Sequence, residues 1–138
     1  GDLQDSPSIL IGAFNNPWTL KTTNSLRFVF RHGNRIEDTW HQLPGWAVVN
    51  NSNSGTTDDY ALISRLFDPH DGHILITAAG IGSFGTEAAA EFLTNPHEMD
   101  EIARTAPAGW QKKNLQIVLH VTVRDVQQNE SIVATQYW

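Results

Sequence analysis

Two apolar runs constrain the fold of this chain more than any other feature of its sequence. ILIGAF occupies residues 9–14 and ILITAA occupies residues 74–79, and turn-forming residues bound each run. Short runs of this kind indicate strands covered on both faces, as in the centre of a parallel sheet. We therefore expect these two segments to be central, parallel strands.

The other strands carry a different pattern. In residues 115–123 the odd positions are apolar and the even ones are largely polar, which predicts a half-buried strand. Residues 60–67 and 73–79 flank a turn rich in Asp, Pro and Gly, and so predict a hairpin. Further strands are expected at residues 26–30 and 46–49, and a last one leads to Trp138.

Helix starts are marked by Asn-Pro pairs at residues 16–17 and 95–96, because Asn caps a helix and Pro favours its first position. An Ala-rich helix is expected at residues 86–93, and the helix after Asn95 must end near Ala106, since Pro107 follows. The order of elements predicts an α/β fold, a Rossmann-like mixed sheet with central parallel strands, antiparallel edge hairpins and helices covering the sheet.

Length and composition exclude several classes of protein. The chain has 138 residues, a formal net charge of −6 and no cysteine. A single domain over residues 1–138 is expected, with a disordered lead-in at 1–6 and a mobile polar loop at 50–59. Nine basic against fifteen acidic residues argue against a nucleic-acid partner. No run approaches the ~20 apolar residues of a membrane helix, so no membrane contact is expected from this segment.

Residues 80–85 read GIGSFG and follow one of the two apolar runs at the start of a helix. Glycines at Gly80, Gly82 and Gly85 allow the backbone to approach an anion, which the free N–H groups of a helix start favour. A dinucleotide site would also need an acidic residue after the next strand, but a second helix fills that interval, so no cofactor is expected. The alternative is that the glycines only form a tight turn and allow close helix–strand packing.

A second loop is expected at the same edge of the sheet, after residues 9–14. If both loops leave the carboxyl edge, their neutral polar groups converge where α/β sheets bind ligands. The ligand-binding set predicted in this way comprises Gly12, Asn15, Asn16, Thr19, Gly80, Gly82, Ser83, Gly85 and Thr86.

Other candidates are carboxylates, imidazoles and aromatic rings. Acid–base candidates are Asp58, Asp59 and Glu87, although carboxylates in a polar loop are usually only solvated. The metal candidates are Asp68, His70, Asp71 and His73, for which turn chemistry is the competing explanation. Arg27 and Arg31 are expected on a solvated strand face, and tryptophans such as Trp40 and Trp138 as half-buried covers rather than a ligand cage.

Four segments together resemble a domain family found mainly in acidobacterial proteins. They are ILIGAFNNPWT at 9–19, DYALISR at 59–65, AGIGSFGTEAAAEFLT at 79–94 and VATQYW at 133–138. In that family the domain is typically the C-terminal region and often follows a membrane-spanning or regulatory part. The resemblance implies no particular activity. It implies a trimmed piece of a bacterial, membrane-tethered protein and favours a sensory or regulatory module.

Three functions follow as hypotheses. The first is a non-catalytic sensor domain that holds a small anionic or nucleotide-like ligand between the loops at 12–19 and 80–87. The second is a small hydrolase or nucleosidase acting on such a ligand. The third is a protein–protein interaction module with purely structural loops, for which a homodimer is one form.

Overall fold

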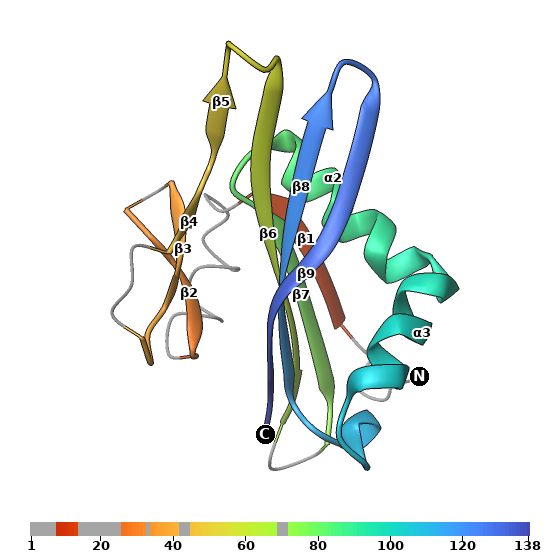
Figure 1. The fold of residues 1–138 in the computed structure, drawn as a ribbon. Coiled ribbons are helices and arrows are strands. Elements are labelled where there is room, and N and C mark those ends of the chain that lie inside the picture. Colours follow the sequence, from red (N-terminus) through yellow and green to blue (C-terminus); the bar gives the residue numbers. More distant parts are fainter. Residues whose placement is uncertain (1–7, 14–25, 33, 42–44, 69–71) are drawn as a thin grey trace.

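The computed structural model describes residues 8–13, 26–32, 34–41, 45–68 and 72–138, which form two sheets and two α-helices (Figure 1). The main sheet has the order β1 (Ser8–Ala13), β7 (Ile74–Gly80), β6 (Thr56–Phe67), β8 (Leu115–Arg124), β9 (Gln127–Tyr137), and β5 (Val49–Asn51) pairs with one end of β6. A smaller sheet contains β2 (Phe28–Arg31), β3 (Arg35–Asp38) and β4 (Trp46–Ala47).

The Rossmann-like prediction is wrong, because the sheets are mostly antiparallel. β1 and β7 do pair in parallel, but β1 lies at the edge of the sheet rather than at its centre. The helical connection from β7 leads to β8, and β6 lies between these two strands, antiparallel to both. Apolar runs report burial on both faces but not the strand order, and here β6 separates the strands that a Rossmann-like unit would place side by side.

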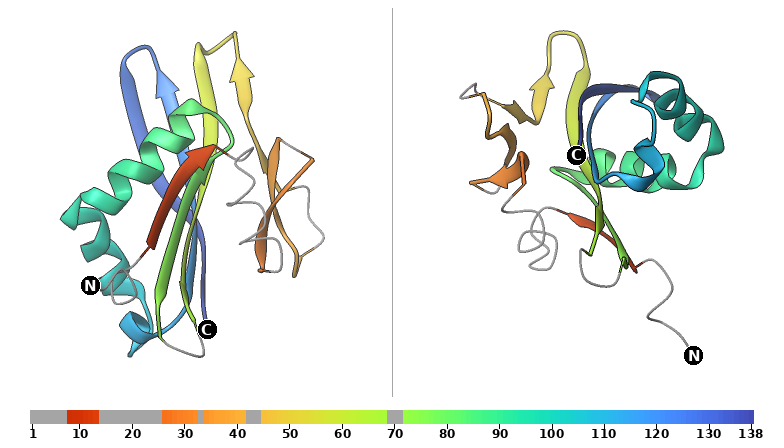
Figure 2. Two further views of the ribbon diagram at one scale, coloured as in Figure 1. Left: turned by 180° about the vertical axis from the view of Figure 1, so that it is seen from behind. Right: turned by 90° about the horizontal axis from the view of Figure 1, so that it is seen from below.

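Both faces of the main sheet are covered, each by a different layer. Helices α2 (Ser83–Thr94) and α3 (Pro96–Thr105) cover one face, and the small sheet lies over part of the other (Figure 2). The predicted Asn95 cap is present, since its side chain accepts a hydrogen bond from the backbone N–H of His97 at 3.0 Å. A short 3₁₀ helix, η1 (Trp110–Lys112), leads into β8.

Alternation along β6 and β8 divides the apolar side chains between two cores. On the helix side, Ile63 and Ile117 pack with Phe92 and Ile102. On the other side, Leu62 and Val118 pack with residues of the small sheet, among them Phe28, Phe30 and Ile36. β8 is therefore buried on both faces over its first five residues, and only its later part is half-buried as the sequence pattern predicts.

Gln116 joins the two sheets from within the core. Its side-chain amide donates to the backbone oxygen of Phe28 at 2.9 Å and accepts from the backbone N–H of the same residue at 2.9 Å. It also donates to Ser64 Oγ at 3.1 Å. One amide thus satisfies a buried donor and a buried acceptor of β2, as a neighbouring strand would.

One other expectation changes, and two fall outside the described residues. Residues 50–59 do not form a polar loop throughout: 49–51 belong to β5, 56–59 belong to β6, and the hairpin turn between them covers only 52–55. The expected lead-in at 1–6 and the helix start at 16–17 lie outside the described residues. Within the described part of the chain, no helix has the length and hydropathy needed to cross a membrane.

Candidate functional site

The glycine-rich turn surrounds a carboxylate of the chain itself. Asp59 on β6 is 1% exposed. Its Oδ2 accepts a hydrogen bond from the backbone N–H of Gly85 at 2.7 Å, and its Oδ1 accepts from those of Gly82 at 3.0 Å and Tyr60 at 2.7 Å. The N–H groups at the start of α2, predicted to face an anionic ligand, therefore face Asp59.

Two of the glycines are required by this close approach. A Cβ at Gly82 would lie 2.7 Å from Asp59 Oδ2, and one at Gly85 would lie 2.4 Å from the backbone oxygen of Tyr60. Thr86 closes the turn, because its hydroxyl donates to the backbone oxygen of Gly82 at 3.1 Å and accepts from the N–H of Gly80 at 3.2 Å. This geometry matches the alternative in which the glycines serve a tight turn.

The remaining predicted ligand and acid–base residues make no contact with Asp59 that the structure shows. Ser83 and Glu87 are exposed at the start of α2. Gly12 lies in β1 and its Cα pairs with that of Ala79, so β1 and β7 end at the same edge of the sheet. The predictions at Asn15, Asn16 and Thr19 fall outside the described residues.

Asp58 points to the opposite face of β6 from Asp59. Its Oδ1 lies 2.7 Å from Nε2 of His120 and accepts a hydrogen bond from the hydroxyl of Thr122 at 3.0 Å. The His120 ring stacks on Tyr60 with 4.8 Å between centroids, and burial, together with the Asp58 charge, raises the pKa of Tyr60. His120 was not predicted from the sequence, because it occupies one of the ordinary polar positions of an alternating strand.

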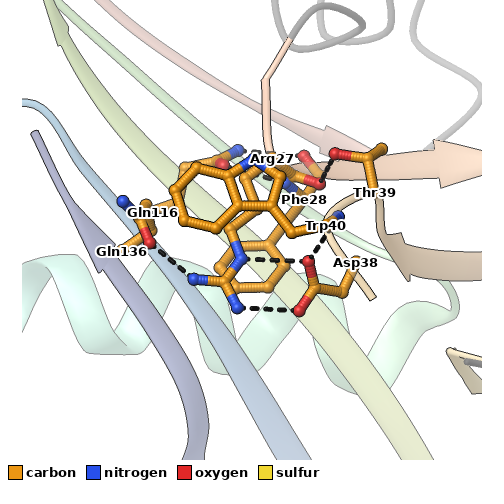
Figure 3. A network of polar contacts seen from close by, with 7 residues as sticks. All are labelled: Arg27, Phe28, Asp38, Thr39, Trp40, Gln116 and Gln136. Carbon is orange, nitrogen blue, oxygen red and sulfur yellow. Dashed lines mark hydrogen bonds and ion pairs between the residues drawn. The ribbon is translucent and has the colours of Figure 1, made fainter. Parts of the chain in front are cut away.

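Arg27 lies at the centre of a second network of polar contacts (Figure 3). The guanidinium donates to both oxygens of Asp38, at 2.9 and 2.8 Å, and to the side-chain oxygen of Gln136 on β9. It also lies over two rings, 4.8 Å from the centroid of Phe28 and 4.4 Å from that of Trp40. The hydrogen bonds from Arg27 lower the pKa of the Asp38 carboxyl from its ordinary value. Arg27 is therefore held in place, not solvated as its position next to Phe28 suggested.

Beside this network lies an open pocket of about 250 Å³, which we call the Trp pocket. Its walls are formed by Leu26, Arg27, Trp40, Gln136 and Trp138. Trp40 is 62% exposed and Trp138 is 43% exposed, so Trp40 is not the half-buried cover expected from sequence. Large apolar rings exposed on a fixed polar support are typical of binding surfaces.

A second open pocket, of about 280 Å³, is acidic, and we call it the Glu pocket. Its lining consists of Glu91, Glu98, Gln128, Asn129 and Glu130. Burial and the neighbouring charges of Glu91 and Glu98 raise the pKa of Glu130 to about 7. Like charges close together favour a shared proton or an added cation.

The predicted metal cluster is only partly described. Asp68 and His73 face each other across the β6–β7 turn, with the backbone N–H of Asp68 donating to the oxygen of His73 at 2.7 Å. His70 and Asp71 lie outside the described residues. Among the residues that the structure does describe, no three His, Asp or Glu side chains come together in a group suited to a metal ion.

The comparisons with known proteins return no relatives. The chain matches no protein-family model, and no curated protein and no solved structure matches it. The resemblance to the acidobacterial domain family and the expected membrane-tethered parent protein therefore stay predictions. The two pockets and the glycine-rich turn are the features of this chain from which a function can be inferred.

Proposed function

We propose that this domain is a protein-binding module that receives an apolar side chain of its partner in the Trp pocket. The observation that carries the proposal is that two exposed rings, Trp40 and Trp138, line the same pocket. Arg27, fixed by its network of contacts, lines that pocket too. Binding hot spots are enriched in Trp and Arg and form around well-packed pockets. A volume of about 250 Å³ suits a single Leu, Met or Phe side chain better than a drug-sized ligand.

The glycine-rich turn supports this proposal over a small-ligand sensor. A carboxylate already accepts the N–H groups of Gly82 and Gly85, and a Cβ at either glycine would clash with β6 or with Asp59 itself. An external anion would have to displace a buried, hydrogen-bonded Asp59. The close approach of the Asp59 carboxylate, which caps the start of α2, is thus sufficient to explain the glycines of this turn.

Selection from a random peptide display library against the immobilised domain tests the proposal. Synthesised winners are expected to lose about 30-fold in affinity on Trp40→Ala or Trp138→Ala, the effect of removing a hot-spot ring. The matched control is Val126→Ala, which truncates an apolar side chain that is 96% exposed at the β8–β9 turn. The proposal would be overturned if the peptides bound the Trp variants as tightly as the wild type. It would also be overturned if only nucleotides and metabolites stabilised the domain against thermal unfolding.

The pair of Asp58 and His120 favours a second candidate function, a small hydrolase. A carboxylate 2.7 Å from a ring nitrogen orients an imidazole as proton acceptor. Under this proposal, hydrolysis of an activated ester such as p-nitrophenyl acetate falls to the uncatalysed rate in His120→Ala. It falls by a smaller factor in Asp58→Asn, which keeps the hydrogen bond but not the charge. Turnover that is unchanged in His120→Ala rejects the hydrolase.

A further inference from the structure

β9 is a long outer strand of the main sheet. Over the described residues it pairs with β8 alone, through eleven residues from Gln127 to Tyr137. Natural edge strands usually carry Lys, Pro or several charges that prevent pairing with another chain. β9 contains no Lys, Arg or Pro, and Glu130 is its single charged residue. A β-bulge at Val133, another feature that hinders edge pairing, interrupts β9 only near its middle, so the backbone on either side of it is suited to accept a further strand.

The two pockets lie at opposite ends of this strand. Gln128, Asn129 and Glu130 line the Glu pocket, whereas Gln136 and the following Trp138 line the Trp pocket. Gln136 lies six positions after Glu130, which corresponds to about 20 Å of extended chain. A single added strand of seven to nine residues would span both pockets.

A bulge places the two pockets on opposite faces of the sheet. Leu119 pairs with Ile132 and Val118 with Ala134, so Val133 is the extra residue and is 41% exposed. Glu130 consequently shares the helix face with Val121, its partner on β8, and Gln136 shares the other face with Gln116. An added strand without a bulge alternates its side chains, so those entering the two pockets must be an odd number of residues apart.

The chemistry of each pocket determines which kind of side chain it would bind. The groups acting on Glu130 are carboxylates of the packed helix layer, namely Glu91 and Glu87 of α2 and Glu98 of α3. A Lys or Arg would neutralise this repulsion, whereas the rings of the Trp pocket favour an apolar side chain.

We propose that the partner is a polypeptide that adds an extended strand to the edge of β9. Its basic side chain enters the Glu pocket, and an apolar side chain five or seven residues away enters the Trp pocket. This inference rests on the proposed function and names the chemistry and conformation of the partner. In such strand addition, main-chain hydrogen bonds supply affinity and the pockets supply specificity.

The probes are acetylated, amidated decapeptides of alternating Thr and Val that carry Lys and Leu. Lys and Leu stand five, six or seven residues apart, in both chain directions, and Kd is measured by tryptophan fluorescence. The five- or seven-residue spacing is expected to bind best. Methylation of alternate peptide nitrogens should weaken that peptide at least about tenfold, because it removes strand hydrogen bonds but keeps the side chains. Glu130→Gln should weaken it about two- to fivefold at low salt.

The controls separate this inference from the proposed function. Val126→Ala, in the β8–β9 turn outside β9 and 96% exposed, should leave Kd unchanged, and thermal denaturation verifies that each variant is folded. If the library-selected peptides depend on Trp40 but the decapeptides do not bind, strand addition is wrong and the Trp pocket stands. The same conclusion follows if N-methylation has no effect. If no peptide depends on Trp40, the proposed function fails.

Discussion

The carboxylate of Asp59 lies 2.7 Å from the backbone nitrogen of Gly85, with both groups buried between β6 and the start of α2. This contact converts a motif that resembles an anion-binding loop into an internal cap. It joins a strand to a helix 26 residues later in the chain, so the turn and β6 hold each other in place.

Asp59→Ala is expected to lower the free energy of unfolding by about 2–4 kcal/mol. The substitution removes the acceptor of the buried N–H of Gly85, which costs about 1–3 kcal/mol, and of the partly buried N–H groups of Gly82 and Tyr60, which cost less because water reaches them. Urea denaturation measures the loss. The neighbouring Asp58→Ala is the control, with an expected loss of about 0–1 kcal/mol, since its hydrogen bonds to His120 and Thr122 are only partly buried. Added formate, which fits the vacated position, should restore part of the stability of Asp59→Ala alone.

Gly85→Ala is expected to destabilise the domain by about 1–3 kcal/mol, because the new Cβ would overlap the backbone oxygen of Tyr60. Ser83→Ala in the same turn should change the midpoint of thermal unfolding little, since Ser83 is exposed. Similar midpoints for the two variants would contradict a requirement for glycine at this position.

Gln116→Leu is expected to lower the free energy of unfolding by about 2–4 kcal/mol. The leucine keeps roughly the same volume but leaves the N–H and oxygen of Phe28 buried without partners. Hydrogen exchange should show the largest increase in β2, which Gln116 attaches to β8. Gln127→Leu, on the exposed start of β9, serves as control. An unchanged exchange rate at Phe28 would refute the role of Gln116.

Glu130 makes stability depend on pH near neutrality. Its pKa in the folded domain is about 7, above the ordinary value of 4.5, so the folded state binds the proton more tightly than the unfolded state. The free energy of unfolding therefore falls as pH rises from about 4.5 to about 7. Glu130→Gln should remove this dependence and raise the thermal midpoint relative to wild type at pH 8 but not at pH 4. A constant difference across this range would contradict the shifted pKa.

Local sequence patterns were sufficient for several elements. The Asn95–Pro96 start and the Pro107 stop define α3, the polar turn defines the β6–β7 hairpin, and alternation defines β8. The physical reason is that caps, prolines and alternation act within a few residues of the chain. The parallel pairing of residues 8–13 with 75–80 also agrees with the apolar runs, although its place at the sheet edge does not.

The strand order and the Trp pocket depend on contacts between residues that are distant in the sequence. Inserting β6 between β7 and β8 creates the antiparallel sheet, and no local pattern encodes which strand lies next to which. The same packing brings Asp59 to Gly82 and Gly85, and brings Arg27 to Gln136, 109 residues away. The sequence alone determined that residues 80–85 contain glycines and the start of a helix, whose free N–H groups favour an anion. Only the tertiary structure decided that the anion is Asp59, because burial of a carboxylate requires donors that another part of the chain supplies.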